Sequence, residues 1–216
     1  MAFEKFDSLS EAEQNSTMQR YYKLQSKIYD ATRWSFLFGR NQIIREIPLD
    51  ANGQWNILEV GCGTGYNLNN LAKRFPNAKL TGLDVSTDMV DLSIKNTQAY
   101  ADRVRVLAQP YMLGDKTWNN QLDLVLFSYS LTMINPHWKD LIMQAKADLK
   151  PGGLIAVTDF HDSRNLWFKK HMANNHVRMD SHLTPLLSQE FTPVVNQVKS
   201  AYLGVWEYML FVGKKA

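Results

Sequence analysis

The chain has 216 residues, of which 45% are hydrophobic and 21% are charged, and its formal net charge at pH 7 is +3. These values are ordinary for one globular domain, so they exclude disordered and fibrous classes. The charge is too small to indicate nucleic-acid binding, although it is compatible with an anionic surface. The single cysteine excludes an internal disulfide and a zinc site built from several cysteines, and it favours a cytoplasmic protein.

The N-terminal region, residues 1–50, is expected to form a helical cap. Its start lacks the basic residues and apolar block of a secretion signal, and no apolar run in the chain approaches the roughly 18 residues that span a bilayer. From about Glu11 to Ile47 the pattern is mostly helical, with breaks at Gly39 and Pro48. Any membrane contact is therefore expected to be peripheral, at the inner membrane surface.

Residues 56–160 alternate short apolar runs with amphipathic stretches, which is typical of βαβ units. The strand-like runs are NILEV, KLTGLDV, VRVL, LDLVLFSYSL and GLIAVTDF, and the helix-like ones are NLNNLAKRF, TDMVDLSIKNTQAY and HWKDLIMQAKADLK. This pattern predicts a parallel sheet covered by helices on both faces. Residues 161–190 are interpreted as a polar lid and residues 191–216 as a C-terminal β-hairpin. All 216 residues are expected to form a single domain.

A glycine-rich turn, LEVGCGTGYN, follows the first predicted strand. Gly61, Gly63 and Gly65 allow a sharp bend and a close approach to a ligand, since side chains there would block it. Asp84 stands at the tip of the second strand, where an acid is placed to accept hydrogen bonds from a ribose. The turn therefore predicts a site for a nucleoside-containing ligand at the carboxyl ends of the strands.

Two residues argue against a dinucleotide at this turn. Tyr66 occupies the position where the dinucleotide fingerprint needs a third glycine, and Glu59 would repel a pyrophosphate. The same Glu59 suits a cationic amino-acid group. S-adenosylmethionine combines that group with ribose and adenine and carries no phosphate, so an NAD-dependent dehydrogenase is the weaker interpretation.

At these residues the chain resembles the class I S-adenosylmethionine-dependent methyltransferases. The family's first motif, E-x-G-x-G-x-G, corresponds to Glu59, Gly61, Gly63 and Gly65, and its ribose-binding acid to Asp84. DVSTDM resembles the segment after that acid, and LKPGG resembles the turn that leads into the fifth strand. The resemblance implies a Rossmann-like α/β fold whose seven-stranded, mostly parallel sheet ends in an antiparallel C-terminal hairpin.

The resemblance also implies S-adenosylmethionine as cofactor and S-adenosylhomocysteine as product. Where the family often has a Gly-Asp or Asn-Ala pair after the third strand, this chain has Gln109 before a proline, and we expect Gln109 to contact the adenine instead. Cys62 is interpreted as a packed residue rather than a nucleophile, because its neighbours in sequence supply no base. The residues expected to bind the cofactor are Glu59, Gly61, Cys62, Gly63, Thr64, Gly65, Asn67, Asp84, Val85, Ser86, Met89, Gln109 and Ser128.

The methyl acceptor must be sought outside these motifs, because methyl transfer depends largely on positioning. Aromatic residues of the cap either dock it on the sheet or line the transfer site, where a π-face stabilises sulfonium or ammonium charge, and Tyr29 is the first candidate for the second role. In the lid, His161 and His176 either take a proton from an ammonium substrate or make ordinary loop hydrogen bonds. The histidine spacings match no standard zinc pattern, so no metal is expected.

The cap segment IYDATRWSFLFGR and the lid segment NNHVRMDSHLTPLL together resemble bacterial methyltransferases of betaine-lipid synthesis, which methylate the amino group of diacylglyceryl-homoserine. The resemblance implies an arginine that binds the substrate carboxylate and aromatic residues around the trimethylated product. The expected substrate-binding residues are Tyr22, Arg33, Trp34, Tyr129, Arg178 and His182.

Two other functions remain open from the sequence. One is a methyltransferase that acts on a soluble small molecule or a quinone precursor. The other is a non-catalytic module that binds the nucleoside and regulates a partner. The sequence points to no nucleic-acid partner, and it leaves the oligomeric state undetermined.

Overall fold

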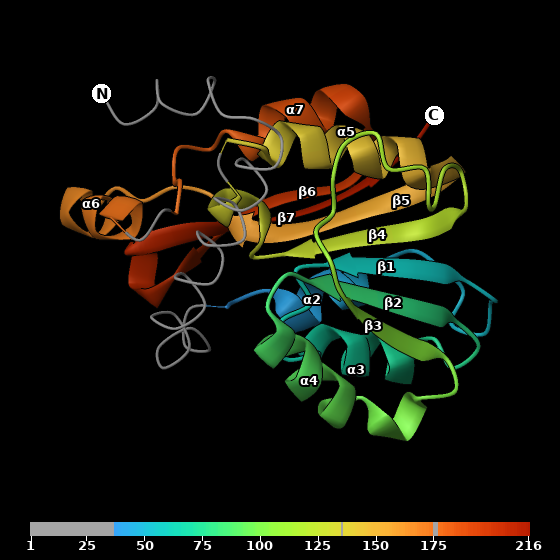
Figure 1. The fold of residues 1–216 in the computed structure, drawn as a ribbon. Coiled ribbons are helices and arrows are strands. Elements are labelled where there is room, and N and C mark those ends of the chain that lie inside the picture. Colours follow the sequence, from blue (N-terminus) through green and yellow to red (C-terminus); the bar gives the residue numbers. More distant parts are fainter. Residues whose placement is uncertain (1–36, 135, 175–176) are drawn as a thin grey trace, which may run out of the picture.

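The computed structural model describes residues 37–134, 136–174 and 177–216 (Figure 1). These residues form a seven-stranded sheet with the strand order β3-β2-β1-β4-β5-β7-β6. The strands are β1 (Asn56–Val60), β2 (Lys79–Asp84), β3 (Val104–Ala108), β4 (Leu122–Ser128), β5 (Leu149–Phe160), β6 (Thr192–Ala201) and β7 (Trp206–Lys214). Every pairing is parallel except those of β7, which is antiparallel to both β5 and β6. The predicted mostly parallel sheet with its antiparallel C-terminal hairpin is confirmed.

Helices cover both faces of this sheet, as Figure 1 shows. They are α2 (Arg40–Glu46), α3 (Tyr66–Arg74), α4 (Thr87–Asn96), α5 (Trp138–Asp148), α6 (Leu166–Asn174) and α7 (Leu183–Glu190), with short 3-10 turns η2 (Gln98–Tyr100), η3 (Leu131–Met133) and η4 (Tyr202–Gly204). One face packs against α2, α3 and α4 and the other against α5 and α7, and each face has its own apolar cluster. Burial on two sides explains why β4 lacks a two-residue alternation. Within the described part of the chain, no helix is both long and apolar enough to cross a membrane.

The region interpreted as a polar lid contains two helices. In α6 the buried residues are Phe168 and Met172, and in α7 they are Leu183 and Leu187. Each pair is spaced by four positions and so lies on one face of its helix. The segment was interpreted as polar because of its histidines, but its two helices pack through these apolar pairs.

The LKPGG segment differs from its predicted role as a turn ahead of the fifth strand. Leu149 already pairs with Leu122, so β5 begins there, and the register then shifts before Leu124 pairs with Leu154. Gly152 adopts a φ of 78° inside this irregularity. The segment is therefore a bulge at the start of β5.

Gly39 marks a tight junction between α2 and the sheet. It has a φ of 81° and directly precedes α2, so the predicted helix break at this position is confirmed. A Cβ on Gly39 would lie 2.7 Å from Cε2 of Tyr208 and 2.9 Å from Oγ1 of Thr158. The absence of a side chain is thus required by both the backbone conformation and the contact with β5 and β7.

Replacing Gly39 by alanine is expected to lower the free energy of unfolding by about 2–4 kcal/mol, because left-handed strain adds to overpacking. Thermal unfolding should show a fall in Tm of at least about 5 °C. Gly114→Ala is the matched control, since Gly114 has a φ of 89° but no described residue lies within 4 Å of an added Cβ. Equal decreases in Tm for the two variants would contradict the importance of the contacts with β5 and β7.

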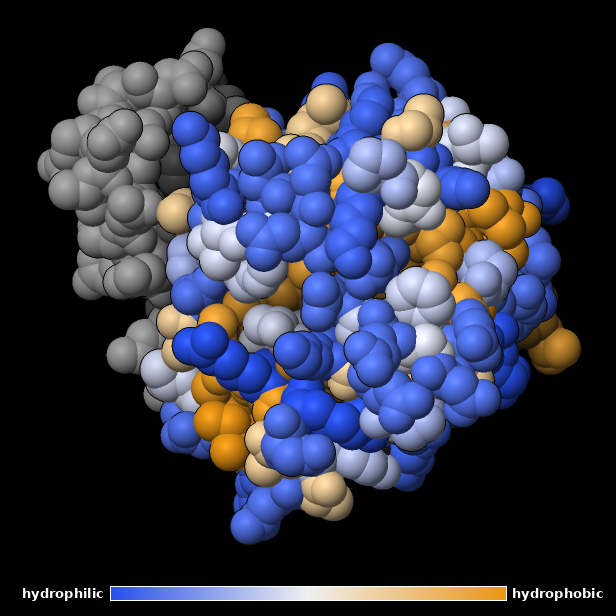
Figure 2. Space-filling model, turned by 90° about the vertical axis from the view of Figure 1, so that its right-hand side faces the viewer, coloured by the Kyte–Doolittle hydropathy of each residue, from blue (hydrophilic) through white to orange (hydrophobic). Residues whose placement is uncertain are grey.

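The end of the molecule where the parallel strands begin is mostly covered by hydrophilic residues (Figure 2). There Asp123 of β4 accepts hydrogen bonds from the backbone N–H of Asn56 at 2.8 Å and from Nζ of Lys150 at 2.7 Å. These contacts connect β1, β4 and β5. The glycine-rich turn lies at the opposite end, where the parallel strands terminate.

Candidate cofactor and acceptor site

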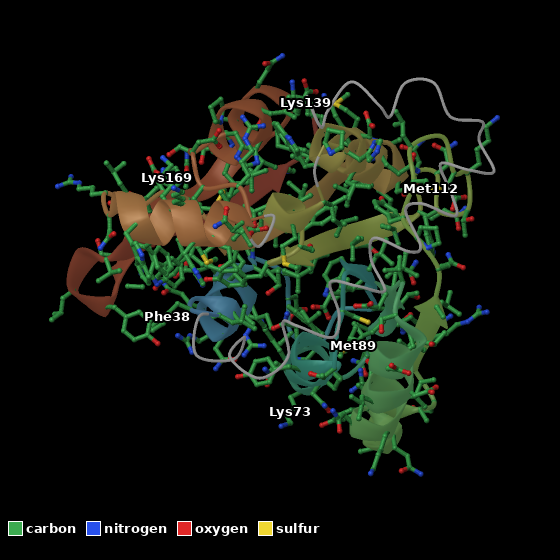
Figure 3. All side chains as sticks on the ribbon, turned by 60° about the vertical axis from the view of Figure 1, so that its left-hand side comes forward. Phe38, Lys73, Met89, Met112, Lys139 and Lys169 are labelled. Atoms are coloured by element: carbon green, nitrogen blue, oxygen red, sulfur yellow. The ribbon has the colours of Figure 1, made fainter. Side chains whose placement is uncertain are left out.

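The glycine turn, residues 61–65, lies at the edge of the sheet where β1, β2 and β4 end. It connects β1 to α3, which begins at Tyr66 as predicted. The strand order reverses between β1 and β4, and ligands of open α/β sheets bind outside the carboxyl ends of strands at such a switch point. Figure 3 turns this side of the molecule forward, with Met89 marking the start of α4. The topology therefore places the turn where a ligand is expected.

The three glycines of the turn all have positive φ, with values of 74°, 52° and 79° for Gly61, Gly63 and Gly65. A Cβ on Gly61 would lie 2.9 Å from Cβ of Ser130, and one on Gly65 would lie 2.5 Å from Oγ of Ser93. Among the described residues, a Cβ on Gly63 would meet nothing within 4 Å. Side chains at Gly61 and Gly65 would thus collide with the protein itself, whereas no described residue would collide with one at Gly63, which is itself buried.

Asp84 fixes the shape of this turn. Its Oδ2 accepts a hydrogen bond from the backbone N–H of Gly63 at 2.8 Å, and its Oδ1 accepts one from the backbone N–H of Ser86 at 3.0 Å. Each carboxylate oxygen has further acceptor capacity. Asp84 can therefore hold the turn against β2 and still accept hydrogen bonds from ligand hydroxyls.

Glu59 is a buried carboxyl directly before the turn, with 1% of its surface exposed. Its Oε1 accepts a hydrogen bond from Nδ2 of Asn67 at 2.7 Å, whereas its Oε2 has no hydrogen-bond partner among the described residues. Burial raises the pKa of Glu59 to about 8, against the opposing effects of the Asn67 bond and the Arg40 guanidinium. A buried carboxyl in this state gains from a cationic ligand group, which the ammonium of S-adenosylmethionine provides.

Two serine hydroxyls add to the unmatched polar groups near the turn. Ser128 ends β4, and Ser130 follows in the next loop beside Gly61; both are buried. Neither Oγ has a hydrogen-bond partner within the described ranges. Buried polar groups in proteins are normally hydrogen-bonded, so this grouping fits a polar ligand seated over the turn. Ser128 was predicted from the sequence, but Ser130 was missed.

Arg40 was also missed as a site residue. Its guanidinium lies 4.1 Å from the centre of the Tyr66 ring and electrostatically lowers the pKa of Glu59. The residues around it enclose a hollow of about 290 Å³, lined by Leu37, Gly39, Arg40, Asn41, Gln42, Arg45 and Tyr66. The sequence signal was a cation directly after a helix-breaking glycine. Arg40 thus places a positive group close to the buried Glu59.

Cys62 is a core residue with 5% of its surface exposed. A Cβ on Gly82 of β2 would lie 2.9 Å from its Sγ, so the thiol packs beneath the turn. Burial raises the pKa of the Cys62 thiol, and the negative charges of Glu59 and Asp84 raise it further. The thiol is therefore not poised as a nucleophile, and a cofactor at the turn would meet the backbone of Cys62.

The remaining predicted cofactor residues surround the turn in different environments. Ser86 caps α4, with its Oγ accepting a hydrogen bond from the backbone N–H of Met89 at 3.4 Å. Met89 is buried, while Val85 and Thr64 are exposed. Gln109 is half-buried just after β3. The structure brings these residues to the same edge of the sheet as Asp84. Ser86 also has a structural role there, as the cap of α4.

Tyr129 differs from its predicted place around the substrate. It is 1% exposed, its ring centre lies 4.8 Å from that of Phe160, and its hydroxyl donates a hydrogen bond to the backbone oxygen of Phe38 at 2.8 Å. Its φ of 55° turns the chain after β4 in an unusual direction. The structure thus gives Tyr129 a packing role, which its position after a strand tip did not reveal.

Arg178 and His182 share one partner, Asp180. Nε of Arg178 donates to Oδ2 of Asp180 at 2.7 Å, and Nδ1 of His182 lies 2.5 Å from Oδ1 of the same residue. The His182 ring also packs edge-on against Trp138, and burial lowers its pKa. A substrate carboxylate at Arg178 would therefore have to compete with Asp180.

His161 directly follows β5 at the same edge of the sheet. Its backbone N–H donates to the oxygen of Glu207 at 2.8 Å, and its Nδ1 is buried with no hydrogen-bond partner in the described part of the chain. Burial lowers the pKa of His161 and so favours the neutral form of its imidazole. The structure does not describe the other predicted acceptor-side residues, which are Tyr22, Tyr29, Arg33, Trp34 and His176.

Asp159 holds the loop that carries Ser130. It is fully buried and accepts hydrogen bonds from the backbone N–H of Thr132 at 3.2 Å and from the Thr132 hydroxyl at 2.5 Å. Burial raises the pKa of Asp159 to about 6. Among the described residues, no group of three or more histidine, cysteine, aspartate or glutamate side chains could hold a metal ion.

Comparison with known families connects this geometry to a family. Residues 57–153 match the family described as "Methyltransferase domain". The matched range runs from β1 to the bulge of β5, and it contains the glycine turn, Asp84 and both serines. The chain carries a class I methyltransferase domain.

Relatives of this methyltransferase domain act on several acceptors, according to their names. The chain is 28% identical over 144 residues to a malonyl-[acyl-carrier protein] O-methyltransferase of Priestia megaterium, covering 66% of this chain and 51% of that protein. It is 27% identical over 164 residues to a demethylmenaquinone methyltransferase of Leptospira interrogans, covering 70% of this chain and 63% of that protein. The chain thus spans less than two thirds of the length of these curated relatives.

A solved structure shares the fold of the methyltransferase domain. It is the 1,6-didemethyltoxoflavin-N1-methyltransferase of Burkholderia thailandensis, with bound 1,6-didemethyltoxoflavin and S-adenosylhomocysteine. The match has a TM-score of 0.72 and 16% identity, and it covers 96% of this chain and 91% of that one. The similarity in fold therefore extends well beyond the residues of the family match.

Proposed function

We propose that the protein binds S-adenosylmethionine over the glycine turn and transfers its methyl group to an amine. The observation that carries this proposal is the grouping of Glu59, Ser128 and Ser130 beside the glycine turn, because their buried polar atoms have no hydrogen-bond partner among the described residues. The methyltransferase domain and the names of its relatives support the cofactor. When bound, this cofactor supplies an electrophilic sulfonium methyl group.

Different residues around the turn would bind different parts of the cofactor. The Glu59 carboxylate would hold the ammonium of the cofactor, and Arg40, whose charge acts on Glu59, would bind the adjacent carboxylate. Asp84 accepts hydrogen bonds from the ribose hydroxyls. Val85 and Met89 lie at the start of α4, where adenine is expected. These contacts hold the donor in one orientation, which is the main requirement for transfer to a nucleophile in line.

For the acceptor we propose the amino group of a lipid headgroup such as diacylglyceryl-homoserine. The resemblance of the cap and lid supports this choice, together with exposed apolar side chains at the same edge of the molecule. His161, and His176 beyond the described residues, would take the proton from the ammonium form, and Tyr29 would face the reacting group. Arg33 or Arg178 would bind the substrate carboxylate. The protein would then act from the cytoplasmic side, in peripheral contact with the inner membrane surface.

A soluble or quinone-like acceptor is the second candidate, because one relative is named a demethylmenaquinone methyltransferase. Purified full-length protein should be incubated with methyl-labelled cofactor and fractionated cell extract. We expect label in the polar lipid fraction, because the proposed acceptor is a headgroup amine. Label only in soluble metabolites or quinones would refute the lipid acceptor. Binding of S-adenosylhomocysteine without label in any fraction would favour a regulatory nucleoside-binding module.

A further inference from the structure

Helix α6 and the β6–β7 turn project from the sheet (Figure 1). Five apolar side chains on these two segments are exposed. We call this set the apolar tip. The exposed fraction is 80% for Leu166, 75% for Trp167 and 110% for Leu203. The tip consists of Leu166, Trp167, Tyr202, Leu203 and Val205. Large side chains with such exposure do not contribute to the core.

The two segments of the apolar tip form one surface. Oγ of Ser163, just before α6, donates a hydrogen bond to the backbone oxygen of Val205 at 2.6 Å. On the inner side of α6 the ring of Phe168 stacks on that of Trp206, with 6.5 Å between their centres. These contacts hold α6 against the hairpin, so the outward side chains of both segments can meet one flat partner together.

The β6–β7 turn presents its side chains outward, and its backbone adopts an unfavourable conformation. Tyr202 and Leu203 have φ values of 47° and 57°, in the left-handed region that glycine and asparagine occupy most easily. Such strain persists only where the surroundings hold it, and it is concentrated at functional positions. Here it places a fully exposed leucine at the very end of the hairpin.

Positive charges outnumber negative ones beside the apolar tip, where Asp162 and Glu207 are the flanking acidic residues. Segment 164–171 contains Arg164, Lys169 and Lys170 and no acidic residue, and segment 199–205 contains Lys199 and no acidic residue. Lys169 extends from α6 in Figure 3 and pairs with Asp162 at 2.7 Å. Tryptophan and leucine flanked by lysine and arginine are typical of segments that lie in the interface of an anionic bilayer. We propose that the apolar tip docks the protein on an anionic lipid bilayer.

Docking at this tip would serve the proposed lipid acceptor. Because β7 runs antiparallel to β5 and Tyr208 pairs with Phe160, the hairpin turn lies at the carboxyl end of β5. The glycine turn and Asp84 lie at the same edge of the sheet. A bilayer at the tip would present its headgroups on the side of the molecule where the methyl donor is held. The inference rests on the proposed function for its purpose, but docking itself can be measured without methyl transfer.

The test is co-sedimentation with vesicles of phosphatidylcholine, with and without phosphatidylglycerol. We expect wild type to bind the anionic vesicles and to dissociate as salt is added. The double variant Trp167→Ser/Leu203→Ser should bind at least about tenfold more weakly, since two large side chains no longer enter the interface. The matched control is Leu92→Ser/Ile94→Ser on α4, where exposed side chains of 44% and 51% lie outside the tip. It should bind as wild type does.

Three results would overturn the docking proposal. The first is absence of wild-type binding to anionic vesicles, and the second is equal binding of wild type and the tip variant. The third is a change of oligomeric state in the tip variant, because a second copy of the chain would then cover the tip. Thermal unfolding verifies that both double variants remain folded. Vesicle binding by a wild type that methylates no lipid would leave docking standing and refute only the proposed acceptor.

Discussion

Asp84→Asn is expected to weaken binding of S-adenosylhomocysteine by at least about a hundredfold, or about 3 kcal/mol. The carboxylate accepts hydrogen bonds from the backbone N–H groups of Gly63 and Ser86 and remains available to the ribose. An amide places an NH₂ group against one of those N–H donors, so the turn loses its anchor and the ligand loses an acceptor. Isothermal titration calorimetry on the full-length protein measures the effect.

The control for this variant is Asp123→Asn at the opposite end of the sheet. Asp123 also accepts one backbone N–H, that of Asn56, and it pairs with Lys150. Its loss should lower Tm without changing the affinity for S-adenosylhomocysteine. An unchanged affinity in Asp84→Asn would place the cofactor elsewhere, and an equal loss in both variants would show that general destabilisation is the cause.

Between pH 6 and 8 the affinity of the wild type for S-adenosylhomocysteine is expected to increase. Burial raises the pKa of Glu59 to about 8, so the carboxylate that would pair with the ligand ammonium is the minor form at pH 6. Its fraction grows by up to about tenfold per pH unit below the pKa. Glu59→Gln should bind weakly and with little pH dependence over this range. A variant that retains the wild-type pH profile would assign the titration to another group.

The same carboxyl has the opposite effect on the stability of the ligand-free protein. Its pKa is raised from 4.5 to about 8, so its contribution to stability is fully present below pH 4.5 and is lost as pH rises through about 8. Asp159, with a pKa of about 6, acts in the same direction, so the comparison of wild type with Glu59→Gln isolates Glu59. At pH 9 the variant should be more stable by a few kcal/mol. A lower Tm for the variant at pH 9 would contradict this account.

The fold and the cofactor turn were predictable because their signals are local. Apolar runs alternate with amphipathic stretches, and the glycines and Asp84 lie within two successive strand tips. Arg40, Ser130 and Asp159 were missed because their roles depend on contacts between distant parts of the chain. No local spacing reveals that Asp159 of β5 fixes the loop after β4, or that α2 brings a guanidinium near Glu59.

The acceptor side was less predictable, for a related reason. Tyr129 stands directly after a strand tip, a position from which a side chain can face a ligand or the core, and its positive φ turns it inward. Arg178 was expected to offer its charge to a substrate, but Asp180, two residues away, pairs with it. Residue type alone therefore indicates which groups can bind a substrate, whereas their partners decide which groups are available.

The hydrogen bond between Gly63 and Asp84 is made within the protein itself. The turn is consequently shaped before any ligand arrives, and little conformational entropy has to be lost on ordering it. Selection among nucleosides then depends on how well each one fits a fixed rim of backbone amides and carboxylates. Small additions to the ribose or adenine should therefore weaken binding, since the turn would have to give up its bond to Asp84 to rearrange around them.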